Sequence, residues 1–145
     1  MAIELNGSAP LFEVFDMPAS FAFYCGVLGF EVLHTNKQPD TDPAHVDWAW
    51  LRRNDVDLML NTADDPGERP PVRPHRVFGA GVCLYIGCPD VDAMYEHLRA
   101  SGVDAPAPKI APYGMKQLYV RDPDGYNLCF QWPVEGGFGD SASGM

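Results

Sequence analysis

The apolar residues follow two different spacings, which predict a strand and then a helix in each half of the chain. In the first half, the β-prone segment 12–16 precedes a segment with helical spacing at 21–28. In the second half, segments 82–86 and 91–98 repeat that order. The apolar positions of the two helices are Phe21, Tyr24, Cys25 and Leu28, and Val91, Met94, Tyr95 and Leu98.

Turn residues divide the segment after each helix into further strands. Gly29 and Gly102 are placed to end the helices, because glycine readily adopts the left-handed backbone of a helix C-terminus. The chain is therefore predicted to run strand, helix, strands, twice. The later strand candidates are 45–51 and 56–61, around a turn at 52–55, and 116–120 and 126–131, around the turn Asp122-Pro123-Asp124-Gly125.

The repeat predicts one domain, 1–145, built from two paired modules. The first module spans 9–62 and the second spans 80–132. The segment 63–79 is rich in proline and is predicted to be a linker, whereas the Gly/Ser-rich segment 133–145 is predicted to be a flexible tail.

Charge and cysteine content narrow the classes of partner and compartment. The chain has ten basic and 20 acidic residues. The resulting formal charge of −10 argues against binding to nucleic acid or to an anionic membrane. No segment approaches the roughly 20 apolar residues of a membrane-spanning helix. The four cysteines form no C-x-x-C pair, so reduced thiols are expected. We expect a cytoplasmic protein.

Four segments of the sequence resemble a known superfamily. They are 16–24, Leu28-Gly29-Phe30, Tyr113-Gly114 and 120–128, and together they resemble the vicinal oxygen chelate superfamily. That superfamily includes glyoxalase I, extradiol dioxygenases, fosfomycin-modifying enzymes and bleomycin resistance proteins. The resemblance implies an α+β fold in which two βαβββ modules form a cup-shaped mixed sheet. It also implies a homodimer, and open sheet edges favour one on physical grounds.

The positions at which this superfamily usually holds a metal are occupied here by unusual residues. By the resemblance they fall on Ala9, Met59, Cys83 and Cys129, in place of the usual His, Glu or Gln. We therefore expect no metal and no other cofactor. One alternative is a soft-metal site for Cu(I) made of Met59, Cys83 and Cys129, although Met and Cys also serve as apolar fillers.

Other candidates for chemistry are weak. The four histidines lack metal-binding spacing, and His45, expected on a strand, is the best of them. No G-x-S-x-G, P-loop or dinucleotide-binding pattern occurs in the sequence. The acids of the turn 122–125 are expected to be structural, because Pro and Gly there satisfy a tight turn.

Strand alternation predicts which side chains line a groove between the bare sheet faces. The groove would combine apolar and aromatic walls with two carboxylates and two amides. Tryptophans and a tyrosine near strand edges would line or roof it, unless the tryptophans belong to the core or a dimer interface. The predicted ligand-binding residues are Leu11, Glu13, Trp48, Trp50, Asp57, Met59, Asn61, Cys83, Tyr85, Tyr113, Cys129 and Gln131.

Such a lining suits a flat, cationic aromatic guest. The leading hypothesis is a metal-free protein that binds a small molecule, resembling the bleomycin resistance proteins that sequester an antibiotic, and it favours a protein that is not an enzyme. The alternative is a lyase, isomerase or dioxygenase with an atypical metal site, or a metal-free enzyme with Glu13 as its base. A third is an interaction module whose groove is filled by side chains.

Overall fold

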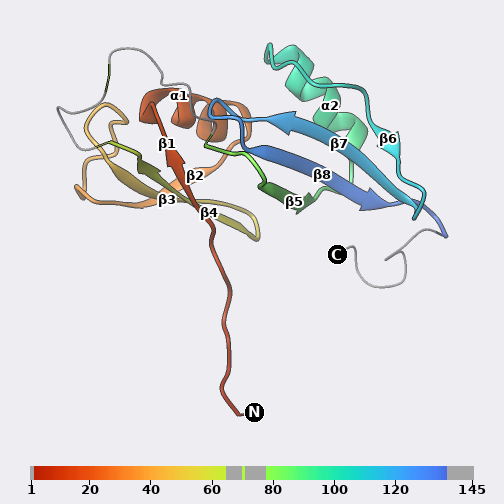
Figure 1. Cartoon of the computed structure of the whole chain (residues 1–145), viewed down its shortest axis with the longest axis horizontal. Coiled ribbons are helices and arrows are strands. Elements are labelled where there is room, and N and C mark those ends of the chain that lie inside the picture. Colours follow the sequence, from red (N-terminus) through yellow and green to blue (C-terminus); the bar gives the residue numbers. More distant parts are fainter. Residues whose placement is uncertain (1, 65–69, 71–77, 137–145) are drawn as a thin grey trace. The chain divides into compact units, whose positions relative to one another are not determined.

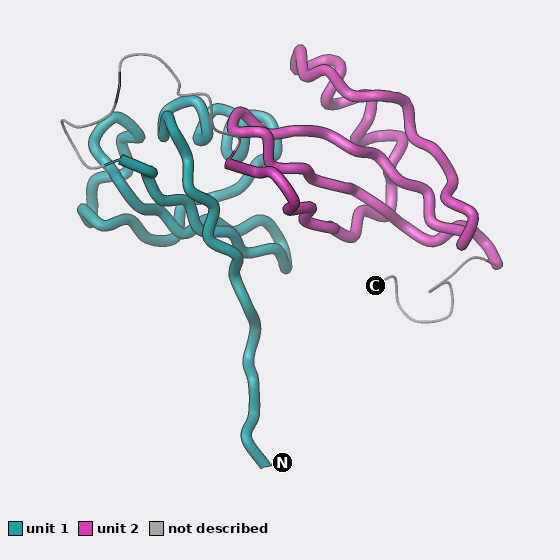
Figure 2. The backbone as a smooth tube through the Cα atoms, viewed as in Figure 1, with its two compact units in different colours: residues 1–76 teal, residues 77–145 magenta. Residues whose placement is uncertain are grey.

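The computed structural model describes residues 2–64, 70 and 78–136. The chain forms two compact units, residues 1–76 and 77–145, which Figure 2 shows in teal and magenta. Most of the predicted linker 63–79 and most of the predicted tail 133–145 lie outside the described residues.

Unit 1 consists of one βαβββ module with a four-stranded mixed sheet. The strands lie in the order β1-β4-β3-β2, with β1 parallel to β4 and the other pairs antiparallel. Its elements are β1 (Leu11–Val14), α1 (Met17–Phe21), the π-helix η1 (Ala22–Val27), β2 (Glu31–Thr35), β3 (Trp48–Arg53) and β4 (Val56–Thr62). Figure 1 labels α1 and the four strands.

The first helical segment begins at Met17, earlier than the predicted start at Phe21, and it ends before Gly29 as predicted. Asp16 caps α1, and its Oδ1 accepts a hydrogen bond from the Ala19 amide at 3.3 Å. The α-helix passes directly into the wider turns of η1. Gly29 follows with a φ of 79°, a left-handed conformation that ends the helical segment.

Unit 2 repeats the module in the same order. Its sheet runs β5-β8-β7-β6, again with the first and last strands of the module parallel. Helix α2 contacts β7 and β8 and covers one face of this sheet (Figure 1). The elements are β5 (Cys83–Gly87), α2 (Val91–Ala100), β6 (Lys109–Ile110), β7 (Met115–Arg121) and β8 (Asn127–Pro133).

The α+β fold of two βαβββ modules is thus confirmed, and strand alternation explains where each core lies. In β1, Phe12 and Val14 are buried while Leu11 and Glu13 are exposed. The same alternation on the neighbouring strands places leucines and other apolar side chains on the buried face. These core side chains include Leu51, Leu58 and Leu60 in unit 1 and Leu118, Leu128 and Phe130 in unit 2.

The turn that the sequence predicts at 52–55 is shorter in the structure. Strand β3 continues through Arg53 and β4 starts at Val56, so Asn54 and Asp55 alone connect them. Asn54 has a φ of 52°, and asparagine tolerates the left-handed conformation that a two-residue hairpin loop requires. As a result, Arg52 lies within the sheet, directly opposite Asp57.

The turn 122–125 has the structural role that the sequence predicts. Asp122 Oδ1 accepts hydrogen bonds from the amides of Asp124 and Tyr126, each at 2.9 Å. Gly125 has a φ of 84°.

None of the described helices is long and apolar enough to cross a lipid bilayer.

Unit 2 should need a glycine at position 79 to keep its full stability. It is buried, and a Cβ atom there would overlap the backbone of Gly125 and Tyr126. We expect Gly79→Ala to lower the free energy of unfolding by about 1–3 kcal/mol in urea denaturation, because a rigid backbone must move.

The matched control is Gly26→Ala, because no atom lies within 4 Å of an added Cβ. Gly26 lies in a helical segment, so this variant should be neutral or stabilised by up to about 1 kcal/mol. Equal stability of both variants and the parent would contradict the close approach at Gly79.

Candidate functional site: a tyrosine and glutamine network beside two pockets

The predicted site residues of unit 1 gather on one face of its sheet. Cross-strand pairing places them in adjacent rows, and their neighbours at alternate positions are the buried core residues. One row is Leu11, Met59 and Trp50; the next is Glu13, Asn61 and Trp48; Asp57 lies opposite Arg52.

The Asp57 carboxylate on this face is already neutralised within the sheet. Arg52 donates Nε to Oδ1 at 2.7 Å and an Nη to Oδ2 at 2.9 Å, a two-pronged ion pair. The indole N–H of Trp50 donates to the same Oδ2 at 3.1 Å. The Arg52 hydrogen bond lowers the pKa of Asp57, and Trp50 adds to this effect. Asp57 therefore holds Arg52 and Trp50 in place and offers little charge to a guest.

The face of unit 2 opposite its apolar core carries a connected set of uncharged polar groups. Gln117 and Gln131 lie opposite each other on β7 and β8, both 8% exposed, and Gln117 Nε2 donates to Gln131 Oε1 at 2.9 Å. The same Nε2 donates to the Tyr113 hydroxyl at 2.7 Å. The Tyr119 hydroxyl donates to Gln117 Oε1 at 3.3 Å. One amide therefore links three neighbouring side chains.

Tyr119 is held in place from two sides. The Tyr119 hydroxyl also lies 3.3 Å from the Tyr85 hydroxyl, and either oxygen can donate in this hydrogen bond. The two rings meet edge to face, with centroids 6.4 Å apart. The hydrogen bond with Tyr85 and burial raise the pKa of Tyr119, so the phenol stays protonated at neutral pH. Tyr119 still has 41% of its surface exposed and available to a guest.

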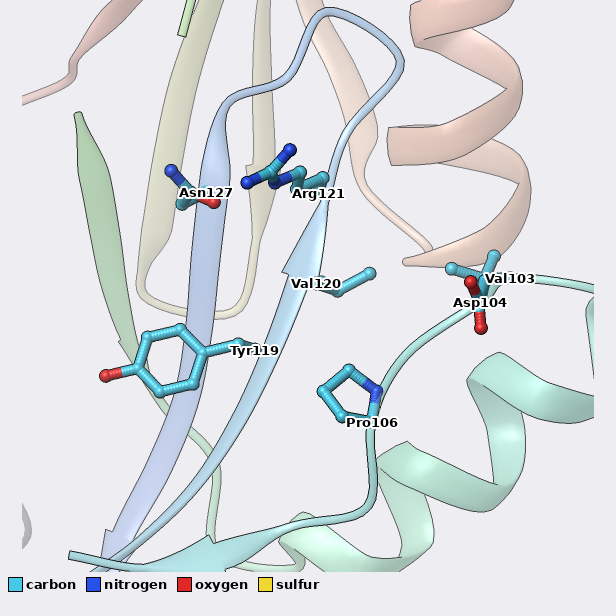
Figure 3. A pocket seen from close by; sticks show the side chains of 7 residues that line it. All are labelled: Val103, Asp104, Pro106, Tyr119, Val120, Arg121 and Asn127. Atoms are coloured by element: carbon cyan, nitrogen blue, oxygen red, sulfur yellow. The ribbon is translucent and has the colours of Figure 1, made fainter. Parts of the chain in front are cut away.

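Two cavities of unit 2 border this network. The β7 pocket, about 570 Å³, is formed by the segment after α2 together with β7 and the start of β8 (Figure 3). The β6 pocket has a volume of about 460 Å³. Pro106 and Tyr119 line both. The β7 pocket is lined by Val103, Asp104, Pro106, Tyr119, Val120, Arg121 and Asn127, and the β6 pocket by Pro106, Ala107, Lys109, Ile110, Ala111, Pro112, Gln117 and Tyr119.

The two pockets differ in charge. Arg121 and Asp104 both line the β7 pocket, so its formal charges cancel. Lys109 is the charged residue lining the β6 pocket, whose other walls are prolines, alanines, Ile110 and the network residues. Both volumes fall within the roughly 300–1,000 Å³ typical of small-molecule sites.

The cysteines of unit 2 are poorly prepared to act as metal ligands. Burial raises the pKa of Cys129 to about 11 and also raises the pKa of Cys83. A thiol must lose its proton to bind a metal, and the raised pKa values make loss of this proton harder at both cysteines. Met59 belongs to unit 1 and both cysteines to unit 2, and the proposed trio stays a prediction.

His45 does not lie on a strand, contrary to the sequence-based expectation. It is in a turn before β3, because β3 begins only at Trp48. Its Nδ1 lies 2.9 Å from Asp40 Oδ2 and 3.8 Å from Asp42 Oδ2 on the protein surface. Within the described part of the chain, no three His, Cys, Asp or Glu side chains gather closely enough to hold a metal ion.

The structure places the five predicted residues of unit 2 in or beside the network. Tyr85, Tyr113 and Gln131 are joined to it by the hydrogen bonds given above. Cys129 lies opposite Tyr85 and Tyr119 but is fully buried, and Cys83 is two residues before Tyr85 on β5.

The two residues at the centre of the network, Gln117 and Tyr119, are not among the residues predicted from the sequence. A signal was present, because Gln117 and Tyr119 alternate along the strand predicted at 116–120. Pairing that strand antiparallel to the next would have placed both on the face of Cys129 and Gln131. Nothing in the local sequence marks Lys109 or Pro106 as pocket residues.

Comparison with protein families gives a match over residues 11–130 to the glyoxalase/bleomycin resistance protein/dioxygenase superfamily. The chain belongs to this superfamily. The resemblance seen in the sequence is thereby confirmed.

Individual relatives agree with this assignment. The protein YaeR of Escherichia coli (strain K12), itself uncharacterised, is 30% identical over 115 residues, covering 78% of this chain and 84% of YaeR. TnmS3, an antibiotic binding protein from Streptomyces sp. CB03234, superposes with a TM-score of 0.66 at 28% identity, over 92% of this chain and 99% of TnmS3. TioX from Micromonospora sp. ML1 has the same fold, with a TM-score of 0.66 at 21% identity over 88% of this chain and 100% of TioX.

The Arg52–Asp57 ion pair should give the stability of the chain a defined pH dependence. Because the folded-state pKa of Asp57 is lowered, the pair stabilises the folded chain above the ordinary aspartate pKa of about 3.9. That contribution is lost as the pH falls through the folded-state value. Asp57→Asn should melt at a lower temperature than the parent at pH 7, and the gap should close towards pH 3.

Asp55→Asn is the matched control, because Asp55 is an exposed acid in the adjacent hairpin turn. Its melting temperature should track that of the parent across the same pH range. A difference between parent and Asp57→Asn that is constant from pH 7 to pH 3 would contradict the stabilising ion pair.

Proposed function

We propose that this protein binds and sequesters a small aromatic molecule, without a metal and without altering the molecule. The observation that carries the proposal is the fixed, partly exposed Tyr119, which borders two pockets of small-molecule size. A side chain held by two hydrogen bonds loses little further freedom when a guest binds, which favours affinity.

The composition of the β6 pocket supports an aromatic guest. Pro106, Ile110 and Pro112 offer rigid apolar surface, while Gln117 and Tyr119 offer polar groups at one side. Flat walls and a few convergent polar groups are typical of sites that hold a planar, partly polar molecule. TnmS3, an antibiotic binding protein of the same fold at 28% identity, makes an antibiotic a reasonable natural guest.

The titratable groups favour binding over proton-transfer catalysis. A general base near neutral pH needs a raised carboxyl pKa. The pKa values of two carboxyl groups, Asp40 and Asp57, are both lowered, by hydrogen bonds and by cations. Glu13, the candidate base, is exposed on β1, and its cross-strand neighbour on β4 is Asn61.

The structure gives less support to a positively charged guest than the sequence does. The expected preference for a cation depends on two groove acids, Glu13 and Asp57, and the Arg52 ion pair already compensates one of them. The proposed function therefore specifies an aromatic guest without a required positive charge.

Titration calorimetry with bleomycin-type and flat polyaromatic antibiotics tests the proposal. Tyr119→Ala should weaken binding of the guest about tenfold, because an aromatic contact of roughly 1–1.5 kcal/mol is lost. Tyr119→Phe should retain most of the affinity, since the ring remains. Mass spectrometry of the recovered guest should show it unchanged.

The matched control is Tyr95→Ala, because Tyr95 lies on α2, packs against Arg99 and lines neither pocket. It should bind as the parent does. Binding that survives Tyr119→Ala unchanged would contradict the assigned site, and conversion of the guest would contradict sequestration.

We also propose that the protein acts as a homodimer. Leu11 on β1 and Tyr85 on β5 are 50% and 46% exposed, and both lie on strands at the edge of their sheets. A second copy would cover such apolar edges. Analytical ultracentrifugation should give twice the chain mass of 16.0 kDa, and a 16.0 kDa species at micromolar concentration would contradict the dimer.

A further inference from the structure

The paired strands β6 and β7 each carry a lysine, and the two ammonium groups have different surroundings. Lys116 lies opposite Ile110, and its ammonium group contacts Asp92 Oδ2 at 2.6 Å, which neutralises it. Lys109 lies opposite Gln117 and lines the β6 pocket. No described carboxylate forms an ion pair with Lys109, and the pocket lining contains no acidic residue. One positive charge is therefore left for a ligand.

The position of Lys109 places this charge beside the proposed aromatic site. Its cross-strand partner Gln117 holds Tyr119 by a hydrogen bond, and all three residues line the same cavity of about 460 Å³. A guest that fills this cavity would meet aromatic surface, amide and hydroxyl groups, and an ammonium group. This combination matches a ring that bears an acidic oxygen.

We propose that the β6 pocket selects aromatic molecules that carry an acidic group, a carboxylate or an ionised phenol, through Lys109. The inference rests on the proposed function and deepens it by naming the class of guest. The proposed guest has the opposite charge to the one expected from the sequence. The two acids that suggested a cation, Glu13 and Asp57, both belong to unit 1, and Asp57 is paired there with Arg52.

The net charge of −10 does not conflict with this preference. At physiological ionic strength, interactions between exposed charges are screened beyond about 8 Å, so the nearest charged group dominates. Lys109 is exposed, and one exposed charge contributes on the order of 1 kcal/mol. We therefore expect a preference of about fivefold for the anionic form of a guest, decreasing as salt is added.

Three probes that differ only in charge test the inference. They are anthracene carrying a carboxylate, a hydroxymethyl or an aminomethyl group on its central ring, titrated by fluorescence into the full chain at low salt. The parent should bind the carboxylate about fivefold more tightly than the hydroxymethyl probe, and the aminomethyl probe most weakly. Lys109→Gln should abolish this order by weakening the carboxylate probe more than the other two, and Lys109→Arg should keep it.

The matched control is Lys116→Gln, which removes the same charge from the neighbouring strand position outside the pocket. It should keep the anion preference. Tightest binding of the aminomethyl probe, an equal effect of Lys109→Gln on all three probes, or an equal loss in Lys116→Gln would overturn the inference. Binding of the hydroxymethyl probe without an anion preference overturns it while leaving the proposed function intact; no binding of any probe overturns both.

Discussion

The hydrogen bond between the buried amides of Gln117 and Gln131 is the interaction on which the proposed site depends. Two amides at 8% exposure must be satisfied within the protein, because an unpaired buried polar group costs roughly 1–3 kcal/mol. Gln117 meets this demand by bonding to Gln131, Tyr113 and Tyr119 together. The requirement to pair one amide thus fixes Tyr119 at the edges of two pockets, and the site is formed before a guest arrives.

The two modules use the corresponding sheet face for different purposes. In unit 1, Arg52, Asp57 and Trp50 form a closed cluster whose charges cancel. In unit 2, the same face carries neutral groups beside a cationic pocket. The repeat therefore preserves the backbone while the chemistry diverges, which is why a fold shared across a superfamily does not by itself name a function.

The fold could be predicted well from the sequence because hydrophobic spacing and helix-ending glycines are local signals. Asp16, Asp90, Gly29 and Gly102 stand where the helices begin or end. The site was harder, because its properties arise from contacts across strands. Asp57 appeared to be a groove acid until the short turn at Asn54 placed Arg52 opposite it.

The central claim is that an aromatic molecule binds unit 2 beside the Gln117–Tyr119 network. The most direct measurement is nuclear magnetic resonance of the isotope-labelled protein during titration with a flat aromatic antibiotic, following the side-chain amides of Gln117 and Gln131 and the backbone amides of residues 106–119. We predict saturable shifts of these signals, with the side-chain amide of Asn61 in unit 1 unchanged. Saturable shifts confined to unit 1, or none in the network at saturation, would contradict the account.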